Sequence, residues 1–258
     1  MTAPVPPEGR DLLRDKVVLV TAAAGTGIGS ATALRCLQEG AEVVISDRHE
    51  RRLAETAASL AEAAGRKPLT VPCDVTDEEQ VRRMVAATVE AHGRLDVMVN
   101  NAGLGGTASV LEMTDEQWSQ VLDVTLTGTF RCTRAALAVM AEQRCGVIVN
   151  NASVVGWRAQ QGQAHYAAAK AGVMALTRCS AMDVAHLGIR VNAVSPSIAA
   201  HAFLAKVTTE ELLDELAGRE AFGRAAEPWE VATVIAFLAS DYSSYLTGEI
   251  VSVSSQHP

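Results

Sequence analysis

A tyrosine and a lysine four residues apart are the residues of this sequence whose types are best suited to proton chemistry. They stand in the stretch Tyr166-Ala-Ala-Ala-Lys170, and a spacing of four places both side chains on one face of a helix. Tyrosine is a weak base at neutral pH because its reference pKa is about 10, but a neighbouring ammonium group favours the phenolate and lowers that pKa. The pair therefore predicts proton exchange with a hydroxyl or carbonyl group. The plainer interpretation is an amphipathic helix with an exposed Tyr and Lys.

A glycine-rich turn follows the first apolar run of the chain. The residues Thr21-Ala-Ala-Ala-Gly25-Thr-Gly27-Ile28-Gly29 precede a helical stretch. Glycines let a backbone turn tightly and approach a pyrophosphate, and the free N–H groups at a helix N-terminus attract the phosphates. The turn predicts a dinucleotide site, although many strand–helix turns carry glycine for local reasons alone.

An acidic residue ends the second apolar run, eighteen residues past Gly29. Asp47 can accept hydrogen bonds from the ribose hydroxyls of NAD, and it would repel the 2′-phosphate of NADP. Arg48 beside it could instead attract that phosphate. We weigh the carboxylate more heavily, so NAD is the expected cofactor and NADP the alternative. Asp47 could also be a solvated loop charge.

The elements that must position these residues alternate along the chain. Short runs rich in Val and Ile are separated by amphipathic stretches, and most of them lack the polar alternation of a sheet with one wet face. This alternation predicts an α/β fold, a single Rossmann-type doubly wound domain of about seven parallel strands with helices on both faces. Such a fold binds ligands beyond the carboxyl ends of its strands, where the strand order reverses. The runs cover residues 17–21, 42–46, 69–73, 96–100, 147–151, 189–194 and 250–254.

Helix starts and domain limits can be predicted from the same pass along the chain. Thr76, Thr114 and Thr208 each stand three residues before a Glu or Gln, which is the pattern of a helix N-cap. Residues 1–14, rich in Pro and charge, are expected to form a mobile arm. The remaining residues, 15–258, are expected to form one domain.

Composition and charge narrow the class of protein. The 258 residues are 48% hydrophobic with a mean hydropathy of +0.14, which excludes intrinsic disorder. A formal charge of −8 argues against nucleic acid or an anionic membrane as a partner. No apolar run reaches the roughly 18–20 residues of a membrane span, and the start lacks the apolar core of a signal peptide. The five cysteines, never spaced as C-x-x-C, indicate reduced thiols and no metal site, so we expect a cytoplasmic protein.

Further motifs lie in a fixed order around the tyrosine–lysine pair. They are Cys73-Asp74-Val75, Asn100-Asn101-Ala102-Gly103, Ser153 thirteen residues before Tyr166, and Arg190-Val-Asn192-Ala-Val-Ser-Pro196. With the glycine-rich turn and the Tyr-x-x-x-Lys stretch, they resemble the short-chain dehydrogenase/reductase family over about residues 16–254.

The resemblance implies roles for individual residues. Ser153, Tyr166 and Lys170 would be catalytic: Ser153 steadies the substrate oxygen, Tyr166 exchanges the proton, and Lys170 also holds the nicotinamide ribose. The residues implied to bind the cofactor are Gly25, Gly27, Ile28, Gly29, Asp47, Asp74, Val75, Asn101, Ala102, Gly103, Tyr166, Lys170, Pro196 and Ile198.

The sequence departs from the family's pattern at several positions. Ala22 stands where the first glycine of the turn is usual, with one extra residue before Gly27, and Ser197 also replaces a glycine. Thr125 occupies the position of the family's catalytic asparagine, and His201 that of a threonine that meets the nicotinamide carboxamide. Whether these two residues take over those functions is left open by the sequence. The ending Val253-Ser254-Ser255-Gln256 also differs, in a region near the family's subunit contacts.

The substrate side is likewise implied by the resemblance. Residues of about 199–224 would form an apolar lid that excludes water from the site. Arg158 or Lys206 could meet a carboxylate or a CoA phosphate, or could be solvated surface charges. The residues expected to line the pocket beside Tyr166 are Val154, Val155, Trp157, Arg158 and Gln161.

Residues 21–33, 150–160 and 195–204 are similar to an actinobacterial subgroup that degrades the C and D rings of sterols as CoA thioesters. The expected function is therefore NAD-dependent interconversion of a secondary alcohol and a ketone on a hydrophobic, steroid-derived, CoA-linked substrate, within lipid metabolism. One alternative is an NADPH-dependent 3-ketoacyl-carrier-protein reductase, and another is a catalytically silent dinucleotide sensor or scaffold.

The family also implies a homotetramer or homodimer, paired through helices at about 115–143 and 164–186. The substrate's identity, its stereochemistry and the direction of the reaction cannot be predicted from the sequence.

Overall fold

A parallel sheet of seven strands runs through the molecule in the order β3-β2-β1-β4-β5-β6-β7. The computed structural model describes residues 3–200 and 215–255. All six strand pairs are parallel, which confirms the doubly wound fold predicted from the sequence. The strands are β1 Val17–Val20, β2 Glu42–Asp47, β3 Leu69–Pro72, β4 Val97–Asn100, β5 Gly146–Asn151, β6 Ile189–Pro196 and β7 Ile250–Val253.

The strands form where the apolar runs lie because both faces of the sheet are covered. All four residues of β1 and of β4 are buried, so neither strand has a wet face that would impose polar alternation. The main helices are α1 Ile28–Gln38, α2 Glu50–Ala64, α3 Glu78–His92, α4 Asp115–Leu122, α5 Gly128–Gln143, α6 Ala164–Val184 and α9 Pro228–Ala239.

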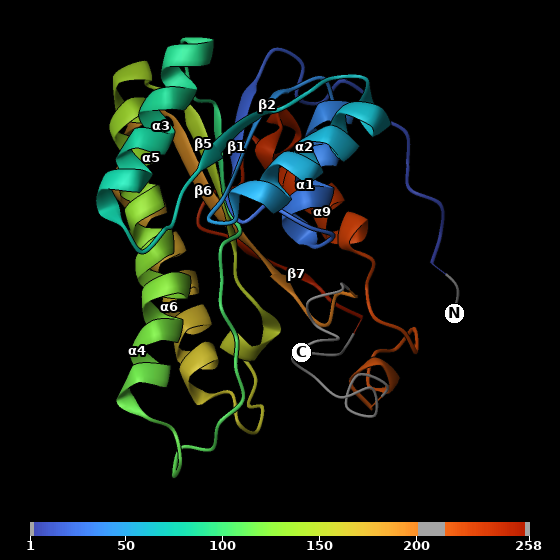
Figure 1. Ribbon diagram of the computed structural model, residues 1–258, viewed down its shortest axis with the longest axis vertical. Helices are drawn as coiled ribbons and strands as arrows, with labels where there is room; N and C mark the ends of the chain where they lie inside the picture. Colours follow the sequence, from blue (N-terminus) through green and yellow to red (C-terminus); the bar gives the residue numbers. More distant parts are fainter. Residues whose placement is uncertain (1–2, 201–214, 256–258) are drawn as a thin grey trace.

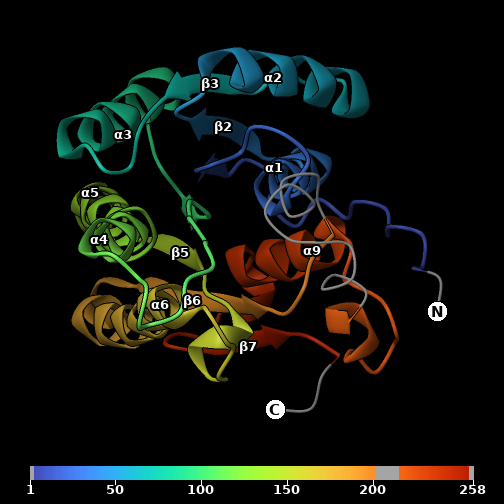
Figure 2. The same cartoon turned by 60° about the horizontal axis from the view of Figure 1, so that its bottom comes forward.

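Two large hydrophobic cores flank the sheet, and the described residues include a third, smaller cluster around Val173 and Met174. On one face, alternate strand residues such as Val18, Val43 and Val99 pack against α1, α2 and α9. On the other face, residues such as Leu19 and Met98 pack against α3, α5 and α6. Figures 1 and 2 show the two groups of helices on opposite sides of the sheet. The period-two alternation of side chains along each strand supplies both cores at once.

The strand order reverses at β1, which lies between β2 and β4. Chain connections leave β1 toward β2 and β3 on one side, whereas β4 to β7 extend on the other side. In folds of this kind, the loops that follow the two strands at such a reversal diverge, and ligands bind beyond the carboxyl ends of these strands. This is the edge at which the predicted site residues are expected to meet.

The helix starts agree with the sequence patterns in one of the two described cases. Thr114 caps α4, and its hydroxyl accepts from the N–H of Gln117, as predicted. The prediction for Thr76 is wrong, because Asp77 is the cap of α3 and its carboxylate accepts from two N–H groups. Thr208 lies outside the described residues.

The predicted arm contacts the C-terminal end of α1. The N–H groups of Arg10 and Leu12 donate to the carboxylate of Glu39 at 2.7 and 3.0 Å. Glu39 is itself fully buried and paired with Arg35. The mobility of residues 1–14 and the single-domain limits 15–258 stay predictions. No helix among the described residues is long and apolar enough to cross a membrane.

Candidate active site

The three residues predicted to be catalytic meet at the carboxyl edge of β5. Ser153 follows that strand and caps a short 3-10 turn, Val154–Gly156. Tyr166 and Lys170 lie one turn apart on α6, as their spacing predicts. A hydrogen bond joins the hydroxyls of Ser153 and Tyr166, and the Lys170 Nζ lies 5.5 Å from the centre of the Tyr166 ring.

Burial controls the titration of this pair. Burial raises the pKa of Tyr166 to about 12, and the hydrogen bond with Ser153 acts in the opposite direction. Burial also lowers the pKa of Lys170 to about 8, since a low dielectric disfavours the charged form of each group. The net rise at Tyr166 is opposite to the lowering that the sequence predicts, because desolvation is the larger effect. The dry site therefore favours a neutral tyrosine until positive charge is present beside it.

The glycine-rich turn reaches the same edge from β1. Ala22 adopts a positive φ of 49° and Gly25 one of 102°, so the turning is shared between Ala22, at the family's glycine position, and Gly25. The N–H of Gly25 donates to the Thr56 hydroxyl of α2 at 2.9 Å. Thr56 was not predicted from the sequence, because the contact joins residues that are 31 positions apart.

The start of α1 fits a dinucleotide phosphate. Gly27 is the cap residue, and no side chain among the described residues caps this end of the helix, so its N–H groups face the turn with a partial positive charge. A Cβ at Gly29 would lie 2.4 Å from the Ala22 carbonyl oxygen and 2.5 Å from the Asn101 Nδ2. Only glycine allows this close approach. Ile28, the first residue of α1, packs against the adjoining hydrophobic core.

Asp47 lies at the end of β2, beside the glycine-rich turn. Its carboxylate accepts from the N–H of Ala24 at 3.3 Å and from the N–H of His49 at 3.0 Å. These bonds fix the carboxylate next to the turn, where a ribose hydroxyl could donate to it. Arg48 is exposed, so a 2′-phosphate could also meet a cation at this position.

The predicted adenine side lies at the carboxyl end of β3. The Asp74 carboxylate accepts from the N–H and hydroxyl of Thr76 at 2.9 and 2.8 Å. Val75 is buried against the second core, and a Cβ at Gly128 would come within 2.7 Å of its Cγ2. The loop that would face an adenine is therefore held from two sides.

The segment after β4 lies between the glycine-rich turn and Lys170. The N–H groups of Asn101 and Ala102 donate to the Thr21 hydroxyl at 3.0 and 3.1 Å. A Cβ at Gly103 would lie 3.4 Å from the Lys170 Nζ. The structure thus brings Asn101, Ala102 and Gly103 between the two parts of the predicted site.

Thr125 lies in a π-helical turn, Asp123–Thr127, that interrupts the long helix between α4 and α5. Its side chain is fully buried, and its hydroxyl both accepts from the N–H of Leu104 at 3.0 Å and donates to the Leu104 carbonyl at 3.2 Å. One hydroxyl therefore fastens the loop that follows Gly103. The hydroxyl at the position of the family's asparagine is therefore bonded to the backbone of Leu104.

The predicted nicotinamide side lies at the end of β6. Ser197, which follows Pro196, donates its N–H to the Val253 carbonyl at 3.2 Å. The Ile198 carbonyl accepts from the N–H of Ala226 at 2.9 Å, so the two stems of the expected lid are joined by backbone bonds. Most of that lid, with His201 and Lys206, lies outside the described residues.

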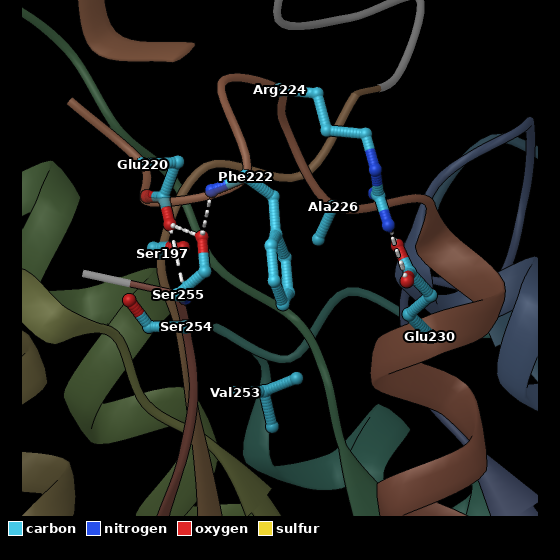
Figure 3. Close-up of a pocket in the computed structure, with 9 residues that line it drawn as sticks. All are labelled: Ser197, Glu220, Phe222, Arg224, Ala226, Glu230, Val253, Ser254 and Ser255. Carbon is cyan, nitrogen blue, oxygen red and sulfur yellow. Dashed lines mark hydrogen bonds and ion pairs between the residues drawn. The ribbon is translucent and has the colours of Figure 1, made fainter. Parts of the chain in front are cut away.

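A cavity of about 160 Å³ lies between these stems and the end of the chain. Glu220, almost fully buried, accepts from the N–H and hydroxyl of Ser255 at 3.0 and 2.8 Å. Figure 3 shows this carboxylate beside Ser255, across the cavity from Arg224 and Glu230. The residues predicted to be catalytic do not line it. The lining residues are Ser197, Glu220, Phe222, Arg224, Ala226, Glu230, Val253, Ser254 and Ser255.

The predicted substrate pocket is partly apolar and partly exposed. Val154 is buried, whereas the indole of Trp157 is 49% exposed. Val155 and Arg158 are partly buried, and Gln161 is exposed. All five follow Ser153 in the segment that leads to α6.

Comparison with known proteins shows the family to which the chain belongs. The sequence pattern described as enoyl-(acyl carrier protein) reductase matches residues 22–255 of the chain. The chain belongs to the short-chain dehydrogenase/reductase family. Members of this family are oxidoreductases that use a nicotinamide cofactor, which agrees with the fit of α1 and its turn to a dinucleotide.

Three known proteins show how similar this short-chain dehydrogenase/reductase is to other members of the family. The chain is 65% identical over 257 residues to the Mycobacterium tuberculosis (5R,7aS)-5-hydroxy-7a-methyl-1-oxo-2,3,5,6,7,7a-hexahydro-1H-indene-carboxyl-CoA reductase, which covers 99% of this chain and 98% of the relative. It is 41% identical over 245 residues, 93% of this chain and 97% of the relative, to the 3-oxoacyl-[acyl-carrier-protein] reductase FabG of Thermotoga maritima. A crystal structure of a short chain dehydrogenase from Mycobacterium smegmatis matches with a TM-score of 0.89 and 60% identity, covering 100% of this chain and 99% of that one.

Proposed function

We propose that this oxidoreductase interconverts a secondary alcohol and a ketone with NAD as cofactor, on a hydrophobic, steroid-derived substrate linked to CoA. The observation that carries the proposal is the hydrogen bond between Ser153 and Tyr166 with the buried Lys170 one helical turn away. These three groups lie at the same edge of the sheet as an uncapped helix N-terminus that suits a phosphate. Proton transfer and cofactor binding are thereby combined at one edge.

Each residue has a distinct part in the proposed reaction. Ser153 would donate a hydrogen bond to the substrate oxygen, whose charge changes during the reaction. Tyr166 would take the hydroxyl proton of the alcohol or return it to the ketone oxygen. The nicotinamide, when bound, accepts or supplies the hydride. Gly27 and Gly29 would admit the phosphates, and Pro196 and Ile198 would line the nicotinamide side.

Lys170 would stabilise the tyrosinate as well as hold the cofactor ribose. Its Nζ lies 5.5 Å from the Tyr166 ring centre, and burial strengthens the attraction between an ammonium and a phenolate. Because the pKa of Lys170 is lowered to about 8, this stabilising charge is present mainly below that pH.

The choice of substrate rests on the 65% identity with the hexahydroindene-carboxyl-CoA reductase, which extends over 99% of this chain. That protein acts on a fused-ring hydroxyketone joined to CoA, as its name states. The apolar Val154 and the half-exposed Trp157 next to Ser153 suit such a ring. The choice of NAD rests on Asp47, whose carboxylate is fixed beside the glycine-rich turn.

A second candidate is a 3-oxoacyl-carrier-protein reductase that uses NADPH. Two observations favour it: the 41% identity with the Thermotoga maritima reductase, and the exposed Arg48 next to Asp47, which could bind a 2′-phosphate. A silent sensor is disfavoured because Ser153, Tyr166 and Lys170 lie together at one edge of the sheet, and cofactor binding alone does not require the bond between Ser153 and Tyr166.

The deciding experiment is a fluorescence titration with NADH and NADPH, followed by turnover of a hydroxyindanone carboxyl-CoA and of a 3-ketoacyl thioester. We expect NADH to bind more tightly and the fused-ring CoA compound to be turned over. Tighter NADPH binding with turnover of the acyl thioester would establish the second candidate instead. Binding of neither nucleotide would overturn the oxidoreductase mechanism proposed for these residues.

The contribution of Tyr166 is tested in the same assay. Tyr166→Phe should retain NADH binding and lose turnover by about a hundredfold or more, the range expected for removal of a general acid or base. Tyr242→Phe is the matched control, because that tyrosine is 77% exposed. Equal turnover by Tyr166→Phe and the natural enzyme would show that Tyr166 is not the general acid or base.

A further inference from the structure

Two pairs of asparagines join the carboxyl ends of β4 and β5, one on each face of the sheet. In the first pair, the Asn100 Nδ2 donates to the Asn150 Oδ1 at 2.8 Å. This pair is bonded to Thr133 of α5 and Thr177 of α6, so it lies on the face that these helices cover. Successive residues of a strand point to opposite faces, and the second pair, Asn101 and Asn151, lies toward α1.

The second pair holds the glycine-rich turn. The Asn101 Nδ2 donates to the Thr21 carbonyl at 3.2 Å and to the Ala22 carbonyl at 3.1 Å. An amide nitrogen has two hydrogens, so both are used. The remaining group of that side chain, Oδ1, accepts from the Asn151 Nδ2 at 2.9 Å. Asn151 therefore helps to fix which way the Asn101 amide faces, because a reversed Asn101 would turn its NH2 group toward the Asn151 Nδ2 and place two donors against each other.

The turn held in this way has little freedom to adjust. Ala22 carries a side chain at a positive φ of 49°, a backbone conformation that residues other than glycine rarely adopt. Its carbonyl oxygen also lies in the narrow space beside Gly29. The Asn101 amide acts on both features of the turn. Its Nδ2 donates to the Ala22 carbonyl and also lies in the narrow space beside Gly29. The orientation of this amide thus helps to set where α1 begins.

The backbone of Asn151 contacts the other half of the site. Its carbonyl accepts a hydrogen bond from the Lys170 Nζ, and Lys170 is only 2% exposed. One residue is thus bonded through its side chain toward the phosphate turn and through its main chain to the lysine.

We propose that Asn151 is a positioning residue that places the cofactor's phosphate turn relative to the Tyr166–Lys170 pair. The proposal rests on the function proposed above, since it assumes that the turn binds a nicotinamide dinucleotide. Asn151 touches neither substrate nor the reacting atoms in this account. It acts through Asn101, whose amide holds the carbonyls of Thr21 and Ala22.

The test replaces the donor of the Asn151–Asn101 bond. Asn151→Asp keeps the shape of the side chain but puts an oxygen against the Asn101 Oδ1, so the Asn101 amide turns or separates from the turn. We expect the NADH dissociation constant and the KM for NAD to rise about tenfold, the effect of losing about one hydrogen bond. The kcat at saturating cofactor should stay within about twofold, because the Asn151 carbonyl still holds Lys170.

Two further variants keep the experiment decisive. Asn151→Leu cannot place a negative charge near Lys170, so it gives the same cofactor effect without an electrostatic one and replaces Asn151→Asp if that variant does not fold. Thr177→Val is the matched control: it removes the acceptor of the Asn150 amide on the opposite face, and should lower the melting temperature without changing NADH affinity.

The outcomes separate the inference from the proposed function. If the natural enzyme binds NADH and both Asn151 variants bind it equally well, the inference is overturned and the proposed function stands. A fall in kcat at unchanged KM for NAD also overturns it. If the natural enzyme binds neither NADH nor NADPH, the proposed function itself fails.

Discussion

Lys170 carries its ammonium group where water hardly reaches, and this has a consequence for stability. Burial lowers its pKa to about 8 in the folded protein, against about 10.4 for an unperturbed lysine. Below pH 8 the group is protonated in both states, and the cost of burying the charge is fully present. Between these two values the unfolded chain binds more protons than the folded protein, so the free energy of unfolding rises with pH.

We predict that this rise disappears in Lys170→Met, which has no group to titrate. Between pH 8 and pH 10 the natural protein should gain about 2 kcal/mol in free energy of unfolding relative to the variant, as expected for about 1.4 kcal/mol per pH unit. Urea unfolding of both proteins at each pH measures the difference. A difference that stays constant over this range would contradict a lowered pKa.

Thr125 occupies the position at which the resemblance implies an asparagine, and its function there remains a prediction. Its hydroxyl makes both bonds to the Leu104 backbone, which an asparagine would share between its oxygen and its nitrogen. We predict that Thr125→Asn retains most of the kcat, whereas Thr125→Val lowers it at least about tenfold, since the partly buried Leu104 N–H then loses its hydroxyl acceptor.

Steady-state turnover at saturating cofactor checks the Thr125 prediction. Thr88→Val is the control, because Thr88 is also fully buried on a helix and its hydroxyl donates to the Met84 carbonyl at 2.9 Å, away from the site. Equal kcat in Thr125→Val and Thr88→Val would show that the Leu104 bonds have no effect on catalysis.

The sequence predicts the residues whose relation is local, and it misses those that depend on long-range contacts. Tyr166 and Lys170 could be placed on one face of α6 because helical spacing fixes their relation. The bonds of Thr125 to Leu104 and of Asn151 to Asn101 join residues 21 and 50 positions apart, and no local pattern encodes such pairings. The net rise in the Tyr166 pKa could not be predicted either, because burial is a property of the assembled fold.

At the scale of elements, the start of α1 lies close against the turn after β1 and against the Asn101 side chain that follows β4. A methyl group at Gly29 would lie 2.4 Å from a backbone oxygen that cannot move freely. We predict that Gly29→Ala lowers the melting temperature and weakens NADH binding at least about tenfold, since the turn must shift to admit the methyl group.

Fluorescence titration and thermal unfolding measure both effects of Gly29→Ala. Ala63→Ser is the control, because Ala63 is an exposed residue near the C-terminal end of α2. If Gly29→Ala binds NADH as tightly as the natural protein, the turn before α1 is not part of the cofactor site.

The elements themselves could be predicted wherever burial leaves a simple pattern. The seven strands lie on the seven apolar runs. For β1 and β4, whose residues are all buried, the continuous apolar run follows from cover on both faces, whereas the edge strand β3 has two exposed residues. The cap of α3 lies one residue after the predicted Thr76, because the Asp77 carboxylate accepts from two N–H groups while the Thr76 hydroxyl is bonded to Asp74. The π-helical turn at Asp123–Thr127 has neither glycine nor proline to mark it.

At the scale of the whole molecule, the outer helices expose large apolar side chains. Trp118 of α4 and Phe130 of α5 are 40% and 41% exposed, and Met182 of α6 is 80% exposed. Burial of such groups favours association of copies about two-fold axes. We predict a homodimer or homotetramer in solution, and a smaller assembly for Phe130→Glu, because a charge at the interface would lose its hydration.

Light scattering at micromolar concentration measures the mass of both proteins. Val5→Glu is a suitable control, because Val5 is 87% exposed near the N-terminus and outside these helices. A monomer at this concentration, or an unchanged assembly in Phe130→Glu, would contradict the pairing of α4 and α5.

The position of β1 at the reversal of the strand order also determines how the chain can be assembled during synthesis. The N–H of Val17 is bonded to the carboxylate of Asp96, 79 residues later, and β4 provides the second neighbour of β1. While the ribosome is still adding the residues between them, β1 can pair only with β2, and its other edge stays open. Pairings this distant form slowly, and an open edge can pair with another chain. Translation through α3 and β4 is therefore the interval in which we expect the nascent protein to depend most on chaperones.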